Sequence, residues 1–115
     1  MENIKIETSP TLTIVTVYTN LVGEAVCEEI FNRVSETEPA FSKPILFDLA
    51  NCRYMSSAGV AMLIKLLTKS KVNNQHFALC NLNQNSKELF AITQLERVFQ
   101  MFADRPSAEK HLLSA

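Results

Sequence analysis

Two adjacent serines stand directly before the most apolar stretch of the chain, in the segment YMSSAGVAML. Ser56 and Ser57 are followed by Ala58 and Gly59, one of only two glycines among the 115 residues. A serine hydroxyl at a helix start can accept a hydrogen bond from a free first-turn amide, which contributes about 1 kcal/mol. One serine suffices for that, and Gly59 would leave backbone amides unshielded at a helix end that tolerates an anion. The residues alone favour a structural cap, with phosphorylation of one hydroxyl as the alternative.

Other chemistry finds little support among the remaining residues. Two glycines cannot form the loop of backbone amides that cradles a phosphate. His76 precedes a predicted strand and His111 lies in a predicted terminal helix, so neither is placed as a base for Ser57. A nucleophilic Cys52 or Ser57 would lack a positioned base, and two histidines without clustered Cys or carboxylate ligands predict no metal site. We therefore expect no enzymatic activity and no cofactor.

Composition indicates one globular domain in a reducing compartment. The chain is 47% hydrophobic and 20% charged, and its net charge of −1 gives no reason to expect nucleic-acid binding. The longest apolar stretch, residues 60–67, is interrupted by Lys65 and is far short of the roughly 20 residues that span a bilayer. Cys27, Cys52 and Cys80 lie in or beside apolar stretches without CxxC spacing, as expected for buried, reduced thiols in a cytoplasmic protein.

Hydrophobic periodicity predicts the elements that position the serines. NIKIE and TLTIVTVYT, separated by a Ser-Pro turn, predict a β-hairpin, and apolar residues at every fourth position over 22–34 predict an amphipathic helix. ILFDL and HFALCNL are short apolar runs typical of strands covered on both faces. With the helix between them they form a βαβ unit, whose right-handed crossover places the helix start at the carboxyl edge of the sheet.

Three further elements complete the chain. SKELFAIT predicts a short helix capped by Ser86, RVFQMF a strand, and PSAEKHLL a closing helix with Pro106 in its first turn. The resulting order is β-β-α-β-α-β-α-β-α. It predicts one α/β domain over residues 1–115, with a mixed sheet of four to five strands and about four helices packed on it.

The helix that follows the serines should also offer a binding surface. Four of its apolar residues are assigned to the sheet by their spacing: Val60, Leu63, Ile64 and Leu67. Met62 and Leu66 would then lie on the opposite side beside Lys65, and we expect these three residues to contact a partner. The alternative is that another helix or a terminal segment covers the two apolar side chains.

The segment LFDLANCRYMSSAGVAMLIKLL resembles the signature of the STAS domain family, specifically of the bacterial anti-sigma factor antagonists. In that family a strand ending in D-L or N-L is followed by a short loop, an aromatic and an apolar residue, then D-S-S-G or S-S-A-G and an apolar helix. The segment aligns without a gap, and the order of elements is similar over essentially the whole chain. The resemblance implies that Ser57, two residues before Gly59, is the phosphoacceptor and that Ser56 is the helix cap, with Ala58 in the place of the family's second serine.

The resemblance implies a switch in protein binding. The unphosphorylated protein would bind an anti-sigma factor that is also a serine kinase, phosphorylation of Ser57 would release it, and a serine phosphatase would reset the switch. A phosphate adds about −1.5 to −2 charges. A penalty of only about 3 kcal/mol in the interface lowers affinity more than a hundredfold.

Two positions depart from the family pattern. Ser56 replaces an aspartate that many members carry, and Val22 stands where an aspartate helps to meet the kinase. Asp48 at the neighbouring strand end could supply the missing charge and would then belong to the partner-binding residues, or could bond loop amides instead. The Val22 departure favours the alternative of a constitutive STAS subunit of a larger complex, such as a lipid-transport ATPase component or a signalling scaffold.

Overall fold

The apolar runs of the sequence form one five-stranded sheet. The structure is a computed structural model that describes residues 3–37 and 41–114. The strands follow one another across the sheet in chain order: β1 (Ile4–Thr8), β2 (Thr13–Val17), β3 (Ile45–Asp48), β4 (Phe77–Cys80) and β5 (Gln100–Phe102). The first pair is antiparallel and the other pairs are parallel. The predicted hairpin and mixed sheet are therefore confirmed.

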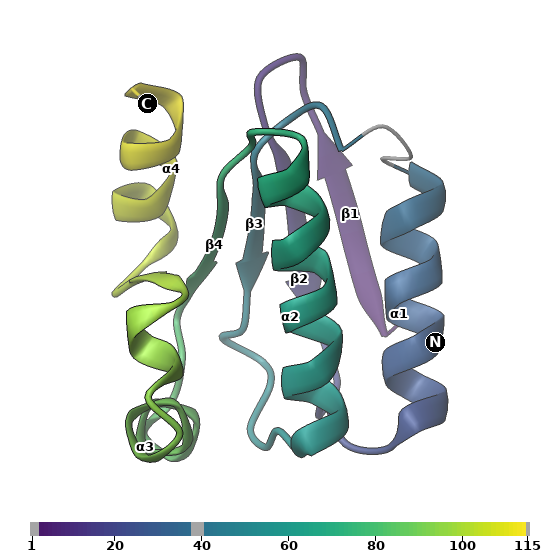
Figure 1. Ribbon diagram of the computed structural model, residues 1–115, viewed down its shortest axis with the longest axis vertical. Helices are drawn as coiled ribbons and strands as arrows, with labels where there is room; N and C mark the ends of the chain where they lie inside the picture. The colour runs from purple at the N-terminus through teal and green to yellow at the C-terminus, as the bar shows by residue number, and fades with distance from the viewer. Residues whose placement is uncertain (1–2, 38–40, 115) are drawn as a thin grey trace.

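Helices cover both faces of this sheet. They are α1 (Glu24–Thr37), α2 (Ser57–Val72), α3 (Gln84–Ile92) and α4 (Arg105–Ser114), with a 3₁₀ turn at Leu95–Arg97. Figure 1 shows α1 and α2 side by side over one face, with the start of α2 at the end of the sheet where β3 and β4 finish. Residues of α4 pack in a second apolar cluster on the opposite face. The predicted α/β class and element order are confirmed, and no helix among the described residues is long and apolar enough to cross a bilayer.

The continuous apolar run of β3 is explained by this double cover. Phe47 belongs to the core beneath α1 and α2, and its ring centroid lies 5.5 Å from that of Phe77 in β4. Leu46 points the other way and packs with Ala108 and Leu112 of α4. Because side chains alternate along a strand, a strand buried on both faces must be apolar at nearly every position.

Two predicted helix starts are corrected by the structure. Helix α1 begins at Glu24 rather than Val22, since Gly23 has a φ of +92°, outside the helical range. Helix α3 is capped by Asn83 rather than Ser86: the Asn83 side chain accepts a hydrogen bond of 2.9 Å from the Ser86 amide. Ser86 lies inside the helix and is buried. Pro106 does lie in the first turn of α4, as predicted.

Candidate functional site

The start of α2 is tied to the residues that follow β2. The Asn20 side-chain oxygen accepts hydrogen bonds from the amides of Arg53, at 3.0 Å, and Tyr54, at 3.2 Å. Leu21 donates its amide to the Tyr54 carbonyl at 3.0 Å and accepts from the Ser56 amide at 2.9 Å. These bonds fix the loop before α2 as a short extension of the sheet, so the serines occupy a defined place.

Ser56 is the N-cap residue by position but not by side-chain chemistry. Its backbone is extended, with φ −97° and ψ 179°, and its hydroxyl makes no capping bond. The hydroxyl instead lies 3.3 Å from the Leu21 carbonyl, to which it donates. The prediction that Ser56 stabilises the helix by accepting from a first-turn amide is therefore wrong, because the hydroxyl is engaged across the loop. Ala58 follows at the second position of the helix and is partly buried.

Gly59 allows α2 to approach the end of β2 closely. A Cβ at this position would lie 2.6 Å from the Leu21 carbonyl oxygen and 2.8 Å from the Met55 Cγ. Both distances are shorter than a side chain can tolerate. The sequence suggested that Gly59 exposes backbone amides, whereas in the structure the residue is buried and its missing side chain makes room for Leu21.

Replacement of this glycine should weaken the fold. Gly59→Ala is expected to lower the free energy of unfolding by about 2 kcal/mol, because overpacking against backbone exceeds the gain in helix propensity. Urea denaturation measures this change in the free energy of unfolding. Gly23→Ala is the contrast, because a Cβ at this position would meet nothing within 4 Å. Only the φ of +92° is unfavourable for alanine, and it should lower the free energy of unfolding by about 1 kcal/mol. A Gly59→Ala variant as stable as the natural protein would contradict this packing argument.

Ser57 is the first residue of α2, and its side chain is accessible. Its hydroxyl forms no hydrogen bond with any of the residues that the structure describes. It lines an open groove of about 710 Å³ between α1 and α2, along with Glu24 and Glu28 on one side and Lys65 on the other. A modifying enzyme could therefore reach this oxygen.

The face of α2 that was predicted to be exposed is partly buried. Met62 is 3% exposed and Leu66 is fully buried, so the expectation that both face solvent is wrong. Ile64, which was assigned to the sheet, is 38% exposed. Helix α2 packs on α1 as well as on the sheet, and Met62 and Leu66 both belong to the apolar core. Of the three predicted contact residues, only Lys65 is exposed, with its Nζ 5.8 Å from the centroid of the Phe31 ring.

The Asp48 side chain bonds to α4, on the opposite face of the sheet. Its carboxylate accepts bonds of 2.9 and 3.1 Å from the Arg105 guanidinium of α4, one of 3.0 Å from Asn81 and one of 3.1 Å from the Ala50 amide. The suggestion that Asp48 lends charge to Ser57 is therefore wrong, and its alternative role of bonding a loop amide is confirmed. Burial by itself raises the pKa of Asp48, but the bonds from Asn81, Ala50 and Arg105 outweigh it and lower that pKa.

The candidate nucleophiles and bases are not assembled into a catalytic group. Cys27, Cys52 and Cys80 are free and buried, as predicted. Burial raises the pKa of all three thiols, that of Cys80 to about 12 with a further contribution from nearby Asp48. The rings of His76 and His111 meet edge to face, with their centroids 6.2 Å apart. His76 directly precedes β4, at the end of the parallel strands opposite to Ser57.

Three asparagines hold the site together although no motif marks them. Asn20 follows β2, Asn81 follows β4, and Asn83 caps α3 while donating to the Arg53 carbonyl at 2.7 Å. Asn81 adopts a φ of +60°, which asparagine tolerates better than most residues. The only sequence signal was the placement of each asparagine soon after an apolar run.

Comparison with known proteins agrees with this geometry. Residues 3–108 match the STAS domain family. A candidate anti-sigma factor antagonist of Thermotoga maritima has a TM-score of 0.86 at 14% identity, with 95% of this chain and 93% of that one covered. The unphosphorylated anti-sigma factor antagonist SpoIIAA has a TM-score of 0.75 at 14% identity, with 93% and 94% covered.

A larger protein contains the same fold as one part of its chain. The murine Solute Carrier 26 family member A9 anion transporter has a TM-score of 0.80 at 14% identity; the match covers 95% of this chain and 19% of the transporter. At these identities the structural likeness establishes the fold alone. The family match, in contrast, spans most of the chain, including the start of α2.

Proposed function

The chain belongs to the STAS domain family, and we propose that it is an anti-sigma factor antagonist, a single domain over residues 1–115 that acts in the cytoplasm. Unphosphorylated, it binds an anti-sigma factor that is also a serine kinase. Phosphorylation of Ser57 ends that binding, and a serine phosphatase restores it. The proposal is carried by the accessible hydroxyl of Ser57, which bonds to no described residue and lies at the rim of the groove between α1 and α2.

The fold can accept a phosphate at Ser57. Helix α2 has 16 residues and no acidic side chain in its first turn, and the Ser56 hydroxyl makes no capping bond there. The amides of Ser57 and Ala58, at the positive end of the helix dipole, bond to no described residue and can therefore meet a phosphate oxygen. A modified protein should accordingly stay folded.

The surroundings of Ser57 explain how the same phosphate would prevent docking. Tyr54 is 57% exposed and Val22 is 50% exposed. Both residues lie on or beside the two hydrogen-bonded segments that position Ser57. A partner that covers these two side chains also removes Ser57 from water. A dianion in that interface must be desolvated, and Glu24 and Glu28 across the groove add repulsion. The expected loss is about 3 kcal/mol, or more than a hundredfold in affinity.

Known structures support the two-state character of the proposal. SpoIIAA, the Bacillus cell fate determinant, has been solved in a phosphorylated form, which matches this chain with a TM-score of 0.71 at 12% identity. The unphosphorylated form matches with a TM-score of 0.75. A STAS fold can thus exist in both states, as proposed for this chain.

Purification of the protein from its own cells, together with whatever accompanies it, tests the proposal. Magnesium and ATP are added, and the intact mass is measured. The expected result is a gain of one phosphate that is lost in Ser57→Ala and retained in the matched control Ser56→Ala. Modification of Ser57→Ala to the same extent would contradict the assignment of the phosphoacceptor.

A second candidate function is favoured by Val22. This exposed apolar residue stands where the family's aspartate helps to meet the kinase, and an anion transporter carries the same fold as 19% of its chain. The chain would then be a constitutive subunit of a larger complex, such as a lipid-transport ATPase component or a signalling scaffold. In the experiment above, a stable complex without any gain of phosphate supports this function over the switch.

A further inference from the structure

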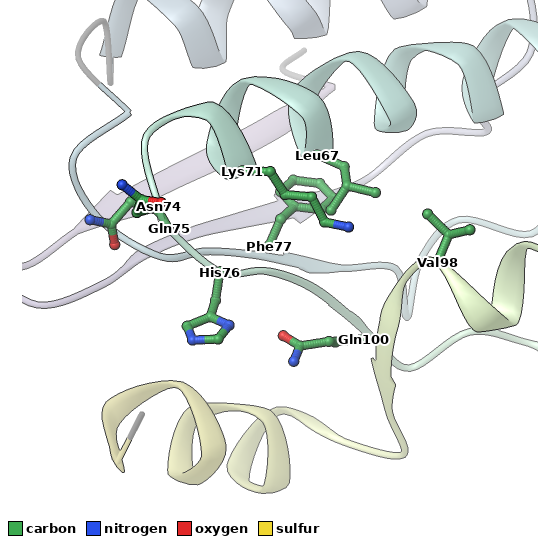
Figure 2. Close-up of a pocket in the computed structure, with 8 residues that line it drawn as sticks. All are labelled: Leu67, Lys71, Asn74, Gln75, His76, Phe77, Val98 and Gln100. Atoms are coloured by element: carbon green, nitrogen blue, oxygen red, sulfur yellow. The ribbon is translucent and has the colours of Figure 1, made fainter.

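A second pocket lies at the end of α2 remote from Ser57 (Figure 2). It has a volume of about 380 Å³ and is lined by residues of the last turns of α2, the start of β4 and the approach to β5. We propose that this pocket binds a small organic anion that has an apolar body and one hydrogen-bond donor. The inference is independent of phosphorylation at Ser57.

Gln100 provides the strongest indication of a ligand. Its side-chain oxygen is buried and has no hydrogen-bond partner among the described residues, while its side-chain nitrogen lies 3.4 Å from Nε2 of His111. Buried polar atoms are nearly always paired, so an unpaired acceptor at a pocket wall calls for a donor. Figure 2 shows the Gln100 amide and the His76 ring facing each other across the opening. After a small rotation of the Gln100 amide toward the opening, an N–H or O–H group of a ligand would satisfy this oxygen.

The charge of the pocket favours an anion. Lys71, in the last turn of α2, lines the pocket and forms no ion pair with the described residues. The side chains of Asn74 and Gln75 add amide donors, and no acidic side chain is among the residues that line the pocket. A carboxylate would therefore meet a cation and neutral donors, without a carboxylate to repel it.

The remaining wall is apolar and fixes the size of the ligand. Leu67, Phe77 and Val98 line the pocket, and Val98 is 45% exposed, which is high for a side chain of this kind. A volume of about 380 Å³ is at the lower end of the range for small-molecule sites. It suits an aromatic or branched acid of about the size of one amino acid derivative.

Titration with indole-3-acetate, followed by amide NMR shifts, tests the inference. This probe combines a carboxylate, an apolar ring and one N–H donor. Saturable shifts are expected at Lys71, His76 and Gln100. Lys71→Gln should weaken binding about fivefold through the lost charge, whereas Lys69→Gln, in the same turn but outside the pocket, should leave it unchanged.

A second ligand isolates the role of Gln100. Because 1-methylindole-3-acetate lacks the N–H donor, it should bind the natural protein about tenfold more weakly. In Gln100→Leu the two ligands should bind equally. The inference is overturned if indole-3-acetate causes no saturable shift at the pocket up to about 5 mM. Equal affinity of the two ligands for the natural protein would also overturn it.

Discussion

Phosphorylated at Ser57, the protein is expected to bind the anti-sigma factor that we propose as its partner at least about a hundredfold more weakly than the unmodified protein. The cause is the dianion that docking would bury beside Tyr54 and Val22, two exposed side chains on the segments that position Ser57. Ser57→Glu adds one charge instead of nearly two, and should lower affinity about tenfold. Calorimetric titration against the proposed partner kinase measures both effects.

The structural control for this result is the stability of the same variants. Ser57→Glu should unfold in urea at the same midpoint as the natural protein or slightly above it, since a carboxylate in the first turn of α2 faces the positive end of the helix dipole. Ser57→Ala should bind as the unmodified protein does. If Ser57→Glu binds with unchanged affinity while folded, the surface around Ser57 is not the docking surface.

The second large effect is expected for Asp48→Ala, which should lower the free energy of unfolding by about 3 kcal/mol at neutral pH. Asp48 is 7% exposed, and its removal takes the carboxylate acceptor from Asn81 and from Arg105, which keeps its hydrogen bond to the Thr16 hydroxyl. Glu7→Ala is the matched control, because Glu7 approaches the same guanidinium only at 3.9 Å and is exposed. That control should cost less than about 0.5 kcal/mol. Urea denaturation at pH 7 compares the two variants.

The contribution of Asp48 should also depend on pH in a definite direction. Folding lowers the pKa of this carboxyl, so the folded protein binds the proton less readily than the unfolded chain. The stabilisation is therefore complete above the unfolded pKa of about 3.9 and is lost as the pH falls through the lower, folded pKa. The difference between the natural protein and Asp48→Asn should be constant from pH 7 to 5 and shrink below about pH 4. A difference that grows on acidification would contradict the assigned pKa shift.

The strands and their order along the chain could be predicted from the sequence because burial on both faces leaves a strong local signal. ILFDL and HFALCNL lie where β3 and β4 were expected, and the βαβ connection determines at which edge Ser57 lies. The sequence predicted helix α2 equally clearly. These features depend on the spacing of apolar residues within short segments, which a single sequence displays directly.

The buried face of α2 could not be predicted by the same means. Apolar residues occur all around this helix, so spacing alone fits more than one buried stripe. The buried stripe is decided by packing on α1 as well as on the sheet, and it includes Met62 and Leu66. The hydrogen bond between Asp48 and Arg105 could likewise not be predicted from a short segment, since 57 positions separate the two residues. Contacts of this kind depend on the assembled layers rather than on any one segment.

The loop before α2 is held chiefly by main-chain groups that bond to Asn20 and Leu21. The exposed side chains of Arg53 and Tyr54 therefore contribute little to the conformation of this loop. Evolution can vary these two positions to redirect recognition while the geometry of the loop persists.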